Sequence, residues 1–376
     1  MVARVHTRLP HLRGELAALT YFRGMDSIRF GVVGAGHIGK RHAEMIRRMS
    51  GCSLVAMADV RDRAACGLGE EIPLYASVEA LLTAHPEVDV LSVCTPNGLH
   101  AEHAIAGLRA GCHVVIEKPM ALTRREGEAV LHAALEAGRQ VFCVMQNRYS
   151  PPSVWLKEVI EGGRLGAVHM VTIECFWNRD DRYYAASPWK GSLALDGGTL
   201  FTQFSHFIDI LYWLFGDIEA ISSRFHDFAH GHSTEFEDSG TVVFDLVQGG
   251  TGTFVFSTAV DRTNFASTLT VVGQHGTIKV GGQYMNEVVH CDIAGYTLPE
   301  LPEAGPANDY GHYKGSAANH HLVYENVVAA LRGTDRIATN ALEGLKVVDI
   351  IERMYAAGER PLKPGVRTAG IQAAAV

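Results

Sequence analysis

A glycine-rich turn near the start of the chain limits what its first half can fold into. The turn follows the apolar run Ile28–Val33, precedes an amphipathic stretch, and consists of Gly34, Ala35, Gly36, His37, Ile38 and Gly39. A G-x-G-x-x-G pattern between a strand and a helix is typical of a dinucleotide-binding site. Gly34 permits the tight turn, Gly36 lets the backbone approach a pyrophosphate, and Gly39 lets the helix pack on the strand. The helix then offers its unpaired N–H groups to the phosphates.

The cofactor that this site prefers is indicated by an acidic residue at the end of the next apolar run, Ser53–Asp59. Asp59 lies 20 residues beyond Gly39, where a carboxylate accepts hydrogen bonds from the adenosine ribose. A 2′-phosphate there would meet a like charge, whereas the nearby Arg61 would favour one. We therefore expect NAD rather than NADP, with Arg61 as the competing influence.

The first half of the chain alternates short apolar runs with helical stretches as far as Asn147. This alternation predicts a doubly wound parallel sheet covered by helices on both faces, over residues 25–147. Expected elements include a helix over Asp62–Glu71 and a strand over Val141–Gln146. The carboxyl ends of parallel strands form the ligand-binding edge. Polar residues that follow two of these strands are therefore candidates for the site: Thr95, Asn97, Glu117 and Lys118.

The second half of the chain has a different pattern of apolar runs. After a strand over Val168–Phe176 and a loop over Trp177–Leu195, several strand-like runs follow one another without helices between them. Such succession predicts an α+β domain, over residues 148–360, with one large, mainly antiparallel, open sheet. Helices are expected over three segments: Thr199–Phe215, Ala317–Leu331 and Ala341–Ala357.

Bulk properties exclude several classes of protein. The formal net charge of −8 argues against a nucleic-acid partner. No apolar run reaches the roughly 18–20 residues that span a bilayer, so no membrane association is expected. Seven scattered cysteines without a C-x-x-C pair predict thiols in a reducing cytoplasm. Residues 1–24 lack a secretory signal and are expected to be a dispensable, disordered extension, and residues 361–376 a flexible tail.

Two side chains could supply acid–base chemistry, and the residues alone leave both open. Lys118 could bind a substrate hydroxyl with a pKa lowered by burial, or be a surface lysine at a strand end. His206 could be a general base or a structural histidine of its helix. Gln203 and Asp209 lie three residues before and after His206, on the same helix face.

Four basic residues could hold an anion, and several histidines are close in sequence. The basic residues are Arg148, Arg179, Arg182 and Lys190; for Arg179 we expect a solvated loop. The histidine groups His226, His230 and His232, and His320 with His321, lack a matching cysteine or carboxylate pattern. No metal is expected.

Taken together, four segments resemble the glucose–fructose oxidoreductase and inositol dehydrogenase family (Gfo/Idh/MocA). They are GVVGAGHIGKRHAE, CTPNGLHAEHA, EKPMAL and DGGTLFTQFSHFIDILYWLFG, and the similarity runs from Ser27 to Ala357. The resemblance implies a Rossmann domain followed by a domain whose open sheet face packs on another subunit, in a dimer or tetramer. It also implies that Lys118 and His206 are catalytic and that Thr95, Asn97 and His100 lie beside the cofactor.

The chain departs from the family at one position, because inositol dehydrogenase-like members carry aspartate where Thr202 stands. The loop from Trp189 through Asp196 to Gly198, and the segment GSAANHHLVYENVVAALRG, look more like bacterial UDP-N-acetylglucosaminuronate 3-dehydrogenases of polysaccharide biosynthesis. That likeness implies NAD-dependent oxidation of a sugar nucleotide at C3. The residues it implies for substrate binding are Asn147, Arg148, Trp189, Lys190, Thr202, Gln203, Asp209 and His320.

Two other functions found in this family remain open at this stage. Some relatives are glycosidases that use NAD in a cycle of oxidation, elimination and re-reduction, which accumulates no NADH. Others are sensors that bind a dinucleotide and a sugar without catalysis. The presence of both Lys118 and His206 favours an enzyme over a sensor.

Overall fold

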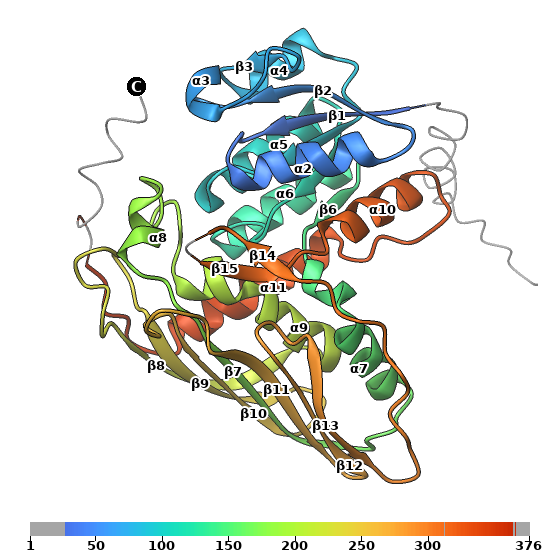
Figure 1. Cartoon of the computed structure of the whole chain (residues 1–376), viewed down its shortest axis with the longest axis vertical. Coiled ribbons are helices and arrows are strands. Elements are labelled where there is room, and N and C mark those ends of the chain that lie inside the picture. The colour runs from blue at the N-terminus through green and yellow to red at the C-terminus, as the bar shows by residue number, and fades with distance from the viewer. Residues whose placement is uncertain (1–26, 312, 364, 366–376) are drawn as a thin grey trace, which may run out of the picture.

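Two β-sheets lie at opposite ends of the long axis of the molecule, with helices between them (Figure 1). The structure is a computed structural model that describes residues 27–311, 313–363 and 365. The expectations for residues 1–24, and most of those for the tail, lie outside the described residues.

The N-terminal sheet contains six strands in the order β3-β2-β1-β4-β5-β6, and every pair is parallel. Its order reverses between β1 and β4, where α/β proteins bind ligands outside the carboxyl ends of the strands. Apolar side chains of α2 and α10 cover one face, and those of α4, α5 and α6 cover the other. The strands are β1 (Ile28–Val33), β2 (Cys52–Ala58), β3 (Leu74–Tyr75), β4 (Val90–Val93), β5 (His113–Ile116) and β6 (Val141–Cys143). The helices of this part are α2 (His37–Arg48), α3 (Arg63–Cys66), α4 (Val78–Ala84), η1 (Asn97–Leu99), α5 (His100–Arg109) and α6 (Arg124–Ala137).

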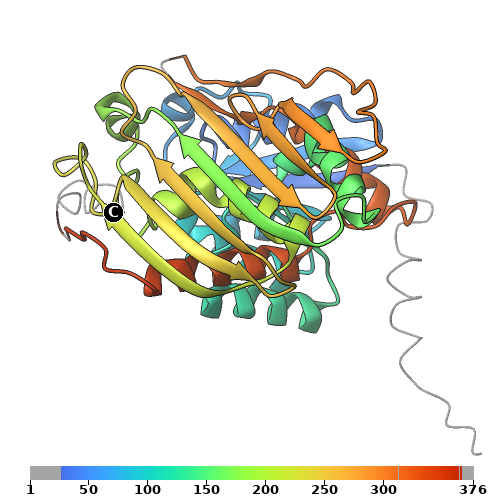
Figure 2. The same ribbon diagram turned by 90° about the horizontal axis from the view of Figure 1, so that it is seen from below.

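The C-terminal sheet contains seven strands in the order β13-β12-β11-β7-β10-β9-β8, of which only β7 and β10 run parallel. Helices pack on one face, and Figure 2 shows the other face open. The strands are β7 (Val168–Phe176), β8 (Ile218–His226), β9 (Ser239–Leu246), β10 (Thr251–Ser257), β11 (Ala266–Gly273), β12 (Gly276–Gly281) and β13 (Glu287–Ile293). The remaining elements are η2 (Gln146–Tyr149), α7 (Pro151–Glu161), α8 (Asp181–Ala185), η3 (Leu200–Phe204), α9 (Ser205–Phe215), β14 (Ala307–Asp309), β15 (Lys314–Ala317), α10 (His320–Leu331) and α11 (Ala341–Ala356). The expected fold class is confirmed.

Three expected elements are shorter than the sequence pattern indicated. The helix over Asp62–Glu71 spans only α3, because Gly67 adopts a left-handed φ of 59° and ends it. The strand over Val141–Gln146 stops at Cys143, and a 3₁₀ turn, η2, begins at Gln146. The helix expected from Ala317 begins at His320, since β15 pairs with β14 as a hairpin.

Two further corrections concern the loop after β7 and the helix that follows it, which carries Gln203 and His206. The expected loop over Trp177–Leu195 contains a short helix, α8, capped by the Asp180 side chain. The single helix expected over Thr199–Phe215 is instead a π-helical turn, η3, followed by α9. Such turns displace the residues before them relative to a regular helix and are frequent at functional sites.

No helix in the described part of the chain is long and apolar enough to cross a membrane. All seven cysteines are free thiols, and five of them are buried.

Candidate active site

The glycine turn between β1 and α2 has the shape that a dinucleotide phosphate needs. A Cβ on Gly34 would lie 2.4 Å from the Cys94 carbonyl oxygen, and one on Gly39 would lie 1.7 Å from the Gly34 carbonyl oxygen. A Cβ on Gly36, by contrast, would meet no atom within 4 Å. Gly34 and Gly39 are therefore required by the fold itself, whereas Gly36 leaves open space at the uncapped N-terminus of α2. That space fits the pyrophosphate of NAD, whose phosphates the N–H groups at the start of α2 would hold.

Asp59 directly follows β2, beside this turn, and is held in place by hydrogen bonds. Its carboxylate accepts the Ala35 N–H at 2.7 Å and forms an ion pair with Arg61 at 2.9 Å. Burial opposes ionisation, but the hydrogen bonds from Arg61 and Ala35 hold the pKa of Asp59 below its ordinary value. The side chain is thus a fixed anion where the adenosine ribose of NAD would lie.

Residues after β4 connect the two halves of the site. Asn97 donates from Nδ2 to the Asp196 carbonyl at 2.9 Å and to the Thr202 hydroxyl at 2.7 Å. His100 lies buried between the carbonyl oxygens of Pro119 and Thr95, at 2.7 and 2.8 Å. His100 therefore positions the loops that surround the cofactor site, while its own ring nitrogens are engaged by protein groups.

Lys118 and His206 come from different domains, and Lys118 contacts the segment that leads to His206. Lys118 follows β5, with a cis bond to Pro119, and its Nζ donates to the Thr202 carbonyl at 2.6 Å. Thr202 lies in η3, four residues before His206. His206 is buried on α9, where its Nε2 lies 3.2 Å from Gln146 Nε2 and its Nδ1 has no hydrogen-bond partner among the described residues.

Burial is the main influence on the pKa values of these two groups. Burial and the neighbouring Lys118 charge hold the pKa of His206 well below its usual value, so its imidazole is neutral near pH 7. Burial also lowers the pKa of Lys118, although the Glu117 and Asp196 carboxylates oppose that shift. A neutral imidazole beside a lysine with a lowered pKa can accept a hydroxyl proton and orient the resulting oxygen.

A second lysine, Lys190, is influenced by Asp196 and Arg179, two of the charged groups that also act on Lys118. Lys190 is buried, with its Nζ 3.9 Å from the centre of the Tyr183 ring, and burial lowers its pKa to about 8. No hydrogen bond from its ammonium group is found among the described residues. Its charge acts on His37 of the glycine turn and on Asp196, so it lies near both.

Arg179 corrects an expectation, because it is 2% exposed rather than part of a solvated loop. Its guanidinium lies against three aromatic rings, those of Trp177, Tyr183 and Tyr313. Its Nε donates to Gln203 Oε1 at 2.7 Å, and Gln203 in turn donates to the Tyr183 hydroxyl at 2.7 Å. Gln203 thus fixes the arginine and the aromatic wall beside Lys190. Arg182, in contrast, is exposed and pairs with Asp180.

Four other expected substrate residues are placed differently. Arg148 and Asp209 form an ion pair at 2.6 Å, and Arg148 also pairs with Glu343 at 2.7 Å. The charges of these three side chains neutralise one another, and the ion pairs link η2, α9 and α11. Asn147 is buried and accepts from Ser316 at 2.5 Å. Trp189 is half-buried in the loop beside Lys190.

His320 joins a buried cluster with Glu117 and His42 that no sequence pattern indicated. His42 Nε2 lies 2.9 Å from Glu117 Oε1, and His320 Nε2 lies 3.6 Å from the same oxygen. The ligand atoms of the three lie within 4.8 Å of one another. His42 is also bound by the Tyr324 hydroxyl at 2.8 Å, so protein hydrogen bonds already use the cluster. The three side chains come from α2, β5 and α10, which no sequence spacing relates.

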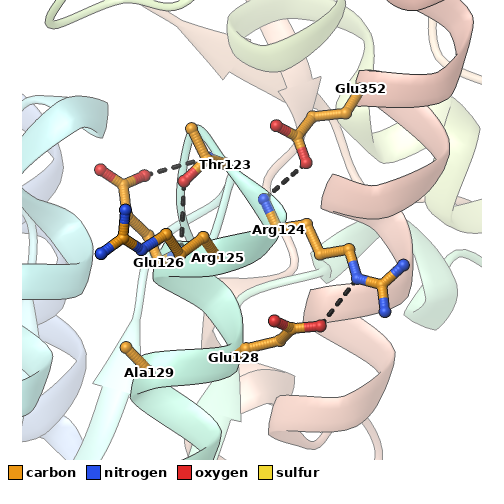
Figure 3. A pocket seen from close by; sticks show the side chains of 7 residues that line it. All are labelled: Thr123, Arg124, Arg125, Glu126, Glu128, Ala129 and Glu352. Atoms are coloured by element: carbon orange, nitrogen blue, oxygen red, sulfur yellow. Dashed lines mark hydrogen bonds and ion pairs between the residues drawn. The ribbon is translucent and has the colours of Figure 1, made fainter.

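A hollow of about 750 Å³ at the start of α6 lies away from this chemistry (Figure 3). Thr123 and Glu126 form a capping box there, and Arg124 is bound by Glu128 and Glu352. These polar groups, which line the hollow, therefore cap α6 and hold it against α11.

Comparison with known families and proteins agrees with this geometry. Residues 28–145 match the family model described as "Oxidoreductase family, NAD-binding Rossmann fold", and residues 154–279 match the "GFO/IDH/MocA C-terminal domain". A solved structure of the WlbA dehydrogenase from Bordetella pertussis, in complex with NADH and UDP-GlcNAcA, is 31% identical with a TM-score of 0.76. The match covers 90% of this chain and 99% of that one.

Two curated relatives point to polyols. An inositol 2-dehydrogenase from Rhizobium meliloti is 25% identical over 333 residues, 87% of this chain and 95% of the relative. The scyllo-inositol 2-dehydrogenase (NADP(+)) IolW of Bacillus subtilis is 30% identical over 205 residues, which are 54% of this chain and 56% of that protein.

Proposed function

Since this chain belongs to the Gfo/Idh/MocA family of NAD-dependent sugar and polyol dehydrogenases, we propose that it oxidises C3 of a UDP-N-acetylhexosaminuronate-like sugar nucleotide. The observation that carries the proposal is the meeting of Lys118 with the His206 segment, through the 2.6 Å contact from Nζ to the Thr202 carbonyl. This contact supports a site in which an ammonium donor and a neutral imidazole act on one substrate hydroxyl.

In the proposed reaction the secondary alcohol loses a hydride from carbon and a proton from oxygen, and a carbonyl forms. Bound NAD supplies the hydride acceptor. His206 accepts the hydroxyl proton, while Lys118 donates a hydrogen bond to the same oxygen and offsets its developing negative charge. The burial of both groups strengthens these interactions, because little water competes for them.

The proposed preference for an acidic sugar rests on two buried cationic side chains, those of Lys190 and Arg179. The ammonium group of Lys190 and the guanidinium group of Arg179 both lie against the Tyr183 ring. A substrate carboxylate would replace water as the partner of Lys190 and form a charge-assisted hydrogen bond. Inositol carries no such group, so this feature favours the sugar-nucleotide substrate over a polyol.

The test is NADH formation with UDP-GlcNAcA, UDP-GlcNAc and myo-inositol under the same conditions. We expect the highest kcat/KM for UDP-GlcNAcA, and transfer of deuterium from C3 of that substrate to the nicotinamide. Lys190→Met should raise KM for UDP-GlcNAcA by about 10-fold or more, as expected for a lost hydrogen bond to a charged group, and change KM for UDP-GlcNAc little. Higher kcat/KM for myo-inositol than for UDP-GlcNAcA would overturn the proposal. Turnover without net NADH would instead indicate the glycosidase cycle.

We also propose that the enzyme acts in the cytoplasm, for polysaccharide biosynthesis, as a homo-oligomer. The free thiols support a reducing compartment.

A further inference from the structure

Asp196 is a buried carboxyl group that the proposed reaction does not use. It is 1% exposed and lies in the loop that leads into η3. Its Oδ2 accepts the Gly191 N–H at 2.6 Å, and its Oδ1 accepts the hydroxyl of Thr202. No cation among the described residues lies within ion-pair distance of it. A buried carboxylate held only by neutral donors is costly, which suggests that its charge serves a purpose.

Each carboxylate oxygen of Asp196 accepts a hydrogen bond from a residue that is linked to one of the two lysines of the site. The residue that donates to Oδ1, Thr202, uses its carbonyl to receive the Lys118 ammonium at 2.6 Å. The residue that donates to Oδ2, Gly191, directly follows Lys190 and has a left-handed φ of 79°. A Cβ on Gly191 would lie 2.6 Å from the Ser233 carbonyl oxygen, so this backbone conformation is tightly fixed.

We propose that Asp196 is a positioning residue that holds both lysines of the site, Lys118 through Thr202 and Lys190 through Gly191. Neither ammonium group is consumed by an ion pair with Asp196, so both keep donors for the substrate. The carboxylate also supplies negative charge near the two cations without touching the reacting atoms. Asn97 completes the arrangement by donating to the Thr202 hydroxyl, which leaves the hydroxyl proton of Thr202 to point at Asp196.

Burial raises the pKa of Asp196 to about 7, against the opposing effects of the Gly191 N–H, Lys190 and Lys118. The carboxylate form, which accepts both hydrogen bonds, therefore predominates above about pH 7. The charged groups that act on Lys118 are Glu117 and Asp196, which raise its pKa, and Arg179, which lowers it. Loss of the Asp196 charge should therefore lower the pKa of Lys118.

The inference rests on the proposed role of Lys118, and the test keeps the two separable. The pKa of Lys118 is measured by competitive labelling with acetic anhydride at a series of pH values, which needs no substrate. We expect Asp196→Asn to lower that pKa and to lower kcat/KM with UDP-GlcNAcA by about 10- to 100-fold, as for loss of a hydrogen bond to a charged group. The matched control is Asp181→Asn, an exposed carboxylate on α8, which should change neither value.

A pair of Thr202 variants covers the case in which Asp196→Asn does not fold. Thr202→Val removes the hydroxyl that binds Asp196 and should lower kcat/KM, whereas Thr202→Ser keeps it and should restore activity. An unchanged Lys118 pKa in Asp196→Asn, or equal activity of the Val and Ser variants, would overturn the inference. If Lys118→Ala keeps full turnover, the proposed role of Lys118 fails, while the labelling result still decides whether Asp196 acts on that lysine.

Discussion

Among single residues, Lys118 and His206 have pKa values lowered by the same main cause, which is burial of both side chains. For His206, the lowered pKa determines the direction in which activity should change with pH. The neutral imidazole is the form that accepts a proton, and a lowered pKa keeps it neutral until the pH falls below the usual histidine value of 6.5. The acid limb of activity that reports His206 should therefore lie below pH 6.5.

Removal of either group gives the first prediction. His206→Ala should lower kcat by about 10²–10⁴, the typical contribution of a general base, and leave NAD affinity nearly unchanged. Lys118→Ala should be similarly severe, and the double variant should be far less than multiplicatively worse if the two act on one carbinol. Steady-state kinetics and NAD titration measure both effects. Near-normal turnover of His206→Ala would leave Lys118 as the base.

A second prediction concerns Asp59, whose carboxylate is bound by Arg61. Asp59→Ser should remove the repulsion of a 2′-phosphate and free the Arg61 guanidinium to bind it, so NADP affinity should rise while NAD affinity falls. Fluorescence titration with both cofactors checks this result. Arg61→Ala is the matched control and should not gain NADP affinity. Tighter binding of NADP than of NAD by the parent protein would show that Arg61 outweighs Asp59.

At the scale of elements, the turn before α2 separates residues needed for folding from those needed for binding. Gly39→Ala places a Cβ against the Gly34 carbonyl and should lower the free energy of unfolding by about 1–3 kcal/mol. Gly36 has an ordinary φ of −72° and open space around it, so Gly36→Ala should leave the melting temperature unchanged. The new methyl group should nevertheless weaken NAD binding at least about 10-fold, since it occupies the approach of the pyrophosphate.

Thermal unfolding and NAD titration of the two glycine variants distinguish the roles. Equal loss of stability in both variants would contradict the assignment of Gly36 to the ligand.

At the scale of the whole molecule, the open face of the seven-stranded sheet is the feature without a covering layer (Figure 2). Val243, Met170 and Val272 are exposed on β9, β7 and β11. An uncovered sheet face with apolar side chains tends to be an interface. We therefore predict a dimer or tetramer that assembles through this face.

The corresponding variant is Val255→Glu, at the outward side of β10 in the middle of the sheet. It should shift the assembly toward the monomer, measured by light scattering at micromolar concentration, because a buried carboxylate without a partner is costly. Leu135→Glu is the control, since Leu135 is 73% exposed on α6, and it should leave the assembly unchanged. A parent protein that is monomeric at that concentration would contradict the prediction.

Local sequence patterns were enough to predict the two successive sheets of the chain and the glycine turn. Period-two apolar runs, helical spacing and the glycine pattern are local signals, and each depends on residues close together in the chain. They were sufficient for the parallel sheet, the antiparallel sheet, Gly34 to Gly39 and Asp59. They failed where tertiary contacts decide the backbone, as at Ala317, which joins a hairpin with β14, and in η3, where a regular helix gives way to a π-helical turn.

Which polar groups contact one another depends instead on how distant segments pack together. Arg179 and Arg182 lie three residues apart in the same polar segment, yet one is buried among aromatic rings and the other is exposed. Arg148 and Asp209 looked available to a ligand but neutralise each other across 61 residues. The links from Asp196 to Lys118 and from His320 to Glu117 likewise join segments that are distant in the chain. Such pairings depend on how α2, β5, η3 and α10 pack, and the free energy of a buried charge depends on its partners in space.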